Sequence, residues 1–254
     1  MSDEVLVHAE GGILTVTINR PQARNAVNRA VAEGIADAMD ELDSNSDLRV
    51  AILTGAEGTF CSGMDLKGFL KGENPIAKDR GFAGLVEGPP AKPLIAAVEG
   101  YALAGGCEIA LACDLIVAGD TATFGVPEVK RGLVAAGGGL IRLPRQISYR
   151  LAMELALTGD SIDAERALAV GLINSVVPAG TALEGAKALA ARINANGPLA
   201  VSLSKKIVAE SGGWDDDTMF ATQQEIAMPA FVSEDAIEGS AAFAEKRAPN
   251  WKGK

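Results

Sequence analysis

Histidine is almost absent from this chain: His8 is the one histidine in 254 residues. A serine or cysteine nucleophile paired with histidine would have to use His8, and histidine-rich zinc sites are excluded. His8 stands in the alternating run Val-Leu-Val-His-Ala-Glu, which predicts an exposed strand residue and not a catalytic base. The chain also lacks a Gly-x4-Gly-Lys-[Ser/Thr] loop and a Gly-x-Gly-x-x-Gly turn after a strand, so nucleotide-fold chemistry is not expected.

Cysteine and long apolar runs are also scarce. The three cysteines, Cys61, Cys107 and Cys113, provide no disulfide framework and match no metal-binding spacing, which favours a reducing cytoplasm. The longest apolar stretch, 109–119, is interrupted by Asp114 and is too short to span a bilayer. The first residues, Met-Ser-Asp-Glu, lack the basic and apolar regions of a signal peptide. We therefore expect a cytoplasmic protein with no membrane partner.

Basic residues are outnumbered: 23 lysines and arginines face 33 acidic residues, for a formal net charge of −10. Such an acidic surface argues against nucleic acid as a partner, although a local basic patch can still bind an anionic small molecule. Hydrophobic residues make up 48% of the chain, and a subunit interface is the expected place for the excess apolar surface.

Hydrophobic periodicity predicts an α/β protein. A β-hairpin is expected over 4–9 and 13–18, a helix capped by Asn28 runs to about Leu42, and a buried strand covers 50–54. Further on, strands at 93–98 and 114–117 enclose a helix at 105–112, a rhythm typical of parallel crossovers. After about residue 145 the pattern is mostly helical around one short strand at 173–177. The later helices are expected at 181–195, 198–211, 215–231 and 233–246.

The segment Leu-Ala-Gly-Gly-Cys-Glu at 103–108 carries the first chemical signal. Gly105 opens a helix directly after a strand, and the first amides of a helix are unpaired and partly positive. Such amides stabilise a carbonyl oxygen that gains negative charge, and Glu108 lies one turn further along the same helix. The structural alternative is that Gly105 and Gly106 only let the helix and strand pack closely.

Two further segments point to the same chemistry. Gly63-Met64-Asp65 follows another buried strand, and the Met64 amide is a candidate second donor to the same oxygen. Glu128 follows Pro127 at the start of a predicted helical turn, where an acidic residue is often only a partner of the helix dipole. Two carboxyl groups that meet in an apolar pocket repel each other, so one keeps its proton and the pair acts as acid and base. A rival acidic cluster at 215–217 is more typical of helix capping than of metal binding.

The segments resemble the crotonase superfamily, and specifically the enoyl-CoA hydratases. The resemblance covers nearly the whole chain. It rests on Asn-Arg-Pro and Arg-Asn-Ala at 19–21 and 24–26, and on the segments 60–67, 92–114, 158–160 and 246–249. It implies an α/β crotonase-like spiral of ββα units over 1–195, followed by a C-terminal helical trimerisation region over 196–254. Assembly as a homotrimer, or as a hexamer made of two trimers, is implied with it.

The resemblance also implies the site and the reaction. The backbone amides of Met64 and Gly105 would hold the thioester oxygen of an acyl-CoA, and Glu108 and Glu128 would handle water and proton in syn hydration of a trans-2-enoyl-CoA. No cofactor beyond the coenzyme A thioester substrate, and no metal, is implied. Coenzyme A or substrate contacts are expected at Arg24, Ala26, Ser62, Asp65, Leu66, Lys67 and Ala136.

One departure leaves the acyl chain open. Many hydratases carry Pro-Gly-x-Gly-Gly-Thr after the second glutamate, whereas this chain has Ala-Ala-Gly-Gly-Gly-Leu at 135–140. Two alternatives remain. The first is an enoyl-CoA isomerase, or a dehydratase of a substituted hydroxyacyl-CoA, that uses the same pocket. The second is a non-catalytic acyl-CoA-binding regulator, against which the presence of both glutamates argues.

Overall fold

The computed structural model describes residues 3–254 and is built around two sheets. The larger sheet has six strands in the order β1-β2-β3-β4-β6-β9, and the smaller one has three in the order β5-β7-β8. β1 and β2 form the predicted hairpin, and each later neighbour in the larger sheet pairs in parallel. The strands are β1 (Val5–Glu10), β2 (Ile13–Ile18), β3 (Val50–Gly55), β4 (Leu94–Val98), β5 (Tyr101–Leu103), β6 (Leu115–Gly119), β7 (Thr123–Gly125), β8 (Ser161–Asp163) and β9 (Ser175–Val177).

The chain winds through the two sheets as a spiral. β4 is followed by β5 and helix α3 (Gly105–Ala112), and β6 is followed by β7 and the 3-10 helix η3 (Pro127–Arg131). Each of these turns therefore gives one strand to the larger sheet and one to the smaller. The segment after β3 joins the small sheet through a bridge between Cys61 and Ala102. The expected α/β spiral of ββα units is confirmed.

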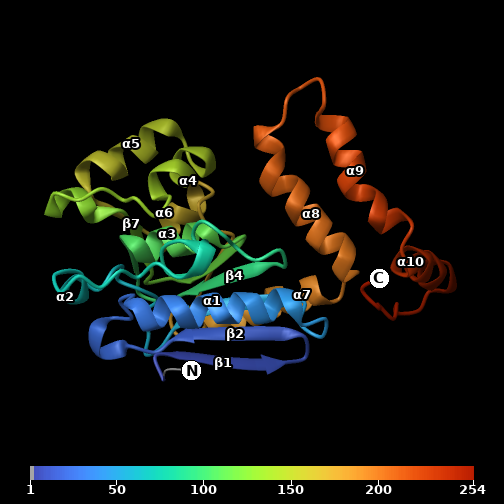
Figure 1. Cartoon of the computed structure of the whole chain (residues 1–254), viewed down its shortest axis with the longest axis horizontal. Coiled ribbons are helices and arrows are strands. Elements are labelled where there is room, and N and C mark those ends of the chain that lie inside the picture. The colour runs from blue at the N-terminus through green and yellow to red at the C-terminus, as the bar shows by residue number, and fades with distance from the viewer. Residues whose placement is uncertain (1–2) are drawn as a thin grey trace.

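Two helices cover the larger sheet from opposite faces (Figure 1). α1 (Arg29–Ser44) begins after Asn28, whose side-chain oxygen accepts a hydrogen bond from the Val31 amide at 2.9 Å. The apolar face of α1 packs in one core with alternate residues of β3, Ala51 and Leu53. α7 (Ala182–Asn194) packs small alanines on the intervening residues of the same strand. This alternation explains why residues 50–53 of β3 are all apolar.

The other helices form two groups. One follows η3 above the small sheet, and the other, α8 to α10, forms an arm beside the core (Figure 1). The expected division between 195 and 196 falls in the turn between α7 and α8. The remaining helices are η1 (Pro21–Ala23), α2 (Leu66–Phe69), η2 (Lys78–Arg80), α4 (Gly139–Gln146), α5 (Tyr149–Thr158), α6 (Ala164–Ala169), α8 (Pro198–Glu210), η4 (Ser211–Gly213), α9 (Met219–Phe231) and α10 (Glu234–Glu245).

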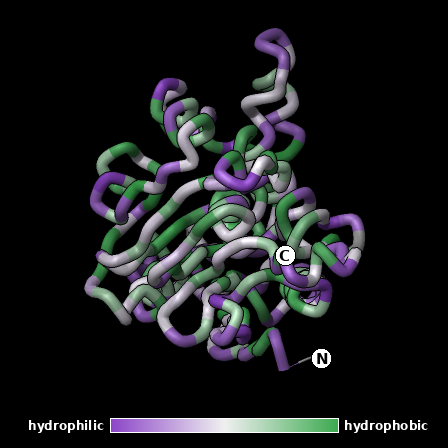
Figure 2. The backbone as a smooth tube through the Cα atoms, turned by 90° about the vertical axis from the view of Figure 1, so that its left-hand side faces the viewer, coloured by the Kyte–Doolittle hydropathy of each residue, from purple (hydrophilic) through white to green (hydrophobic). Residues whose placement is uncertain are grey.

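The structure differs from the sequence-based expectation at several places. The whole small sheet went unpredicted, and α4 starts before the expected helical region at 145. α9 begins at Met219, so the exposed acidic cluster at 215–217 lies in the preceding turn and its carboxylates do not cap the helix. Hydrophilic segments are frequent in the turns at the edge of the molecule (Figure 2). Across residues 3–254, no helix combines the length and the apolar character needed to cross a membrane.

Candidate active site

The turn between β5 and α3 brings backbone amides to the surface of the core. Ala104, with φ +53°, is the residue with unusual backbone angles, and neither Gly105 nor Gly106 has positive φ. The two glycines are needed for space. A Cβ on Gly106 would stand 2.1 Å from the Cys61 carbonyl oxygen, and one on Gly105 would stand 2.6 Å from the Phe82 ring. Close packing therefore explains these glycines, while Gly105 still begins the helix with its amide unpaired.

A second turn presents the Met64 amide beside the first. Gly63, with φ +104°, lies so close to α3 that a Cβ on it would be 3.1 Å from the Gly105 nitrogen. The Val27 amide donates to the Gly63 carbonyl at 2.8 Å, and the Asp65 amide donates to the Val27 carbonyl at 2.8 Å. The Met64 amide consequently points away from residue 27. Within residues 3–254 neither the Met64 nor the Gly105 amide has a protein acceptor, as donors to a ligand oxygen require.

Glu108 is enclosed by a glycine-rich loop. Only 4% of the residue is exposed, and its Oε1 accepts a hydrogen bond from the Gly139 amide at 2.9 Å. A Cβ on Gly137 would stand 2.6 Å from Glu108 Oε2. The triplet at 137–139 can therefore wrap the carboxyl group because it has no side chains there. Glu128, in η3, is half-buried, and its buried Oε2 has no hydrogen-bond partner in the described chain.

The two carboxyl groups lie in each other's electric field. Burial raises the pKa of Glu108 to about 7, and the charge of Glu128 adds to this rise, whereas the amides of Gly139 and Gly137 and the charge of Arg142 oppose it. Burial also raises the pKa of Glu128, with Arg131 as an opposing charge. Both groups therefore hold protons more readily than exposed glutamates, as acid–base groups near neutral pH require.

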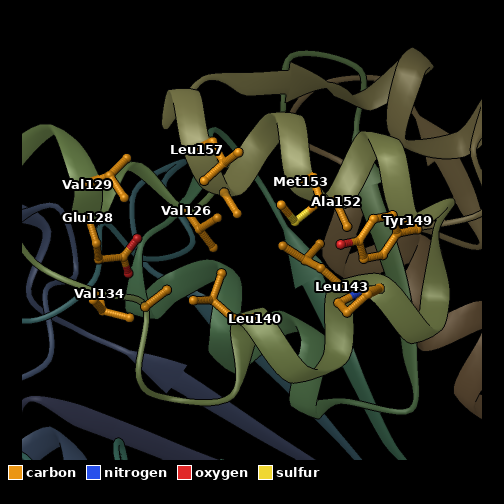
Figure 3. Close-up of a pocket in the computed structure, with 13 residues that line it drawn as sticks. Val126, Glu128, Val129, Val134, Leu140, Leu143, Tyr149, Ala152, Met153 and Leu157 are labelled. Atoms are coloured by element: carbon orange, nitrogen blue, oxygen red, sulfur yellow. The ribbon is translucent and has the colours of Figure 1, made fainter.

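An apolar cavity of about 330 Å³ extends from Glu128 toward Tyr149 (Figure 3). The Glu128 carboxyl group is turned toward this cavity and is the only carboxyl group in its lining. α4 and α5 supply much of the wall, including Leu140, Met153 and Leu157. Sequence reasoning missed this wall, since its residues form ordinary amphipathic helices with no motif. A cavity with one acidic end and aliphatic sides suits an apolar group attached to a reacting centre.

Most of the residues expected to contact coenzyme A lie on two adjoining segments. Arg24 is exposed, with its guanidinium 5.9 Å from the centre of the Tyr101 ring, and its carbonyl accepts from the Ser62 amide at 3.1 Å. Ala26 is buried, and its carbonyl accepts from Arg20 at 2.6 Å. Leu66 and Lys67 are exposed at the start of α2.

Asp65 and Ala136 have different surroundings from the rest of that set. The Asp65 carboxylate caps α2 by accepting from the Lys67 and Gly68 amides, and it pairs with Arg20 at 3.0 Å. Its side chain is thus occupied within the protein. So is its main chain, because the Asp65 amide donates to the Val27 carbonyl at 2.8 Å and the Asp65 carbonyl accepts from the Phe69 amide at 2.9 Å. Ala136 is exposed and precedes the glycine triplet around Glu108, apart from the two segments at 24–27 and 61–67. The coenzyme A contacts of all seven residues stay predictions.

Comparison with known proteins agrees with this arrangement. The sequence profile of the enoyl-CoA hydratase/isomerase family matches residues 8–254. The chain is 45% identical to enoyl-CoA hydratase EchA19 of Mycobacterium tuberculosis, over 98% of this chain and 96% of the relative. It is 38% identical to carnitinyl-CoA dehydratase of Proteus mirabilis, over 100% of both chains. A crystal structure of an enoyl-CoA hydratase from M. tuberculosis H37Rv superposes with a TM-score of 0.98 at 61% identity, covering 100% of both chains.

A spiral α/β core with two unpaired amides beside one buried and one half-buried glutamate defines an enzyme of the crotonase fold. This chain belongs to the enoyl-CoA hydratase/isomerase family.

Proposed function

We propose that this protein is an enoyl-CoA hydratase that adds water to a trans-2-enoyl-CoA and yields the 3-hydroxyacyl-CoA. The observation that carries the proposal is the placement of Glu108 and Glu128 in one another's field beside the turns that bear the Met64 and Gly105 amides. A binding protein needs neither carboxyl group, and burying both raises the free energy of the folded state. Their retention favours catalysis over a purely regulatory role.

The reaction proposed here uses only groups of the chain. The amides of Met64 and Gly105 hold the thioester oxygen, which draws electrons from the double bond and makes C3 electrophilic. Glu108 takes a proton from water as the water oxygen bonds to C3, and Glu128 supplies the proton that reaches C2. Dehydration of a 3-hydroxyacyl-CoA follows the same path in reverse. No cofactor is needed, because the thioester itself supplies the electron-withdrawing group.

The cavity favours an uncharged acyl tail. A relative named carnitinyl-CoA dehydratase raises the question of a charged acyl group. A quaternary ammonium group in this cavity would meet one carboxyl group, Glu128, and one aromatic ring, Tyr149, in an otherwise aliphatic wall. The reaction itself requires Glu128. A cation buried in such surroundings loses its hydration with little compensation. We therefore favour hydration of aliphatic enoyl-CoAs, with crotonyl-CoA as the shortest test substrate.

Assembly and location complete the proposal. We propose a homotrimer or a dimer of trimers, supported by exposed apolar side chains on the C-terminal arm such as Phe231 and Phe243. We also propose a cytoplasmic location, because the three cysteines are free thiols buried in the fold.

The test is to follow the loss of the conjugated enoyl absorbance with crotonyl-CoA, with longer aliphatic enoyl-CoAs, and with a trimethylammonium-bearing enoyl-CoA. Glu108→Gln and Glu128→Gln should each lower kcat by about 100-fold or more, because each removes a proton-transfer group without changing its shape. Glu154→Gln, at an exposed position on α5, is the matched control and should leave kcat unchanged. If full hydration survives both active-site changes, or if no enoyl-CoA is hydrated, the proposed function is wrong.

A further inference from the structure

Arg142 is a charged residue near the site that the mechanism above does not use. It lies on α4 and is partly buried, and its Nη2 donates to the Val86 carbonyl at 2.6 Å. This bond ties α4 to the segment that precedes β4. Withdrawing an arginine from water in this way, with a backbone carbonyl as its hydrogen-bond partner, costs free energy. A nearby opposite charge can offset that cost.

The glycine triplet separates Arg142 from Glu108. A Cβ on Gly138 would stand 2.2 Å from Arg142 Nη1, while Gly139 donates to Glu108 Oε1 at 2.9 Å. Gly138 also has φ +97°, a conformation that favours glycine. The guanidinium and the carboxyl group thus flank the same short loop.

The charges that act on Glu108 come from two elements. Glu128 faces it from η3 and raises the pKa of Glu108, whereas Arg142 faces it from α4 and lowers that pKa; Arg142 is the one cation among the causes. The neighbouring thiol, Cys107, has a pKa raised to about 12 by burial and remains neutral. Burial lowers the pKa of Arg142 itself. Glu108 and the buried Cys113 oppose this fall, and Arg145 on the same helix adds to it.

We propose that Arg142 is a positioning residue that holds the glycine loop against the Glu108 carboxyl group and favours the ionised form of that group for water activation. The proposal rests on the hydratase function proposed above. In its absence, Glu108 would keep its proton to higher pH, because burial and Glu128 would then act without an opposing cation. The enzyme would lose activity on the acid side of its pH profile first.

The experiment compares the pH dependence of kcat/KM for crotonyl-CoA hydration among Arg142→Gln, Arg142→Lys and Arg145→Gln. Arg142→Gln keeps a polar side chain and removes the charge, so the midpoint of the acid limb should rise by about 0.5 to 1.5 pH units. Arg142→Lys keeps the charge and should hold the midpoint near that of the wild type. Arg145→Gln removes an equal charge at an exposed position of the same helix, and should leave the midpoint unchanged.

A second readout does not depend on the reaction. The infrared absorption of carboxyl groups reports the titration of Glu108 without substrate. For each protein, the spectrum of the same protein carrying Glu108→Gln is subtracted, so that the signal of Glu108 remains. The same upward shift is expected there for Arg142→Gln, and Arg142→Met replaces that variant if it does not fold. A lower rate at every pH with an unchanged Glu108 titration would overturn the proposal, since Arg142 would then be structural. If the wild type hydrates no enoyl-CoA, the function fails, while the infrared titration still decides the role of Arg142.

Discussion

At Glu108, burial and ionisation are opposed. The side chain is almost fully enclosed, yet water activation requires its charged form. Its pKa of about 7 places both protonation states within reach near neutral pH, which is the condition under which a proton-transfer group is most effective. The rise comes first from burial and then from Glu128. The same features that make the group reactive therefore reduce the stability of the folded protein.

Replacing Glu108 with glutamine should stabilise the protein at alkaline pH. In the unfolded chain this carboxyl group loses its proton near its ordinary pKa of 4.5, whereas the folded protein holds the proton until about pH 7. The folded state binds more protons between these values, so stability falls as pH rises through this window. By pH 8 the loss amounts to about 3 kcal/mol, which glutamine does not incur.

Urea unfolding at pH 4.5 and at pH 8, at one protein concentration, measures this difference. Glu108→Gln should match the wild type closely at pH 4.5 and exceed it in unfolding free energy at pH 8. An equal difference at both pH values would mean that packing, and not ionisation, separates the two proteins.

Single residues were predictable from sequence where a local pattern marked them. Glu108 stands one turn after a glycine pair, and Glu128 follows a proline, so the sequence marks both as candidates. Arg142 and Gly139 were missed, because their importance comes from a loop folding back over α3 from a distance of about 30 residues. A sequence run of three glycines shows that space is needed there. It does not show which side chain fills that space.

Among the elements, the start of α3 depends on contact with the segment after β3. Gly106→Ala should lower the free energy of unfolding by about 1–3 kcal/mol or more, because its Cβ would meet the Cys61 carbonyl oxygen, a backbone atom that cannot turn aside. Gly212→Ala is the matched control, with open space around its Cβ and no positive φ. Thermal unfolding of both variants measures the effect. Equal melting temperatures for the two would show that the two segments do not pack this closely.

The strands of the larger sheet and the helices that pack on it were predictable because most of them are long enough to show a hydrophobic period. The hairpin, α1, β3 and α3 all lie within a few residues of their expected bounds. β5, β7 and β8 have three residues each, fewer than two full repeats of a strand pattern. They become neighbours only when the spiral brings successive turns of the chain together. Their existence follows from how successive turns stack, which periodicity within a short window does not reveal.

For the whole molecule, the apolar composition has a visible consequence in the C-terminal arm. Phe243 is 87% exposed, Phe231 76%, Val232 75% and Ile237 73% in the single chain. These four residues lie on or next to α9 and α10, beside the core rather than within it (Figure 1). Clustered side chains of this kind are typical of a surface that another subunit covers. The sequence alone indicated an excess of apolar residues, and the folded chain exposes several of them on the arm.

Phe243→Asp should therefore dissociate the proposed assembly. Light scattering coupled to gel filtration is expected to give three or six times the 26.1 kDa chain mass for the wild type, and a smaller multiple for the variant. An aspartate buried without a partner in an apolar interface weakens it strongly, since charge must leave water. Leu6→Asp, at an exposed apolar position on β1 and so outside the arm, is the control and should keep the wild-type mass. A wild type that elutes as a monomer would show that the arm is exposed in solution, and the assembly would have to be abandoned.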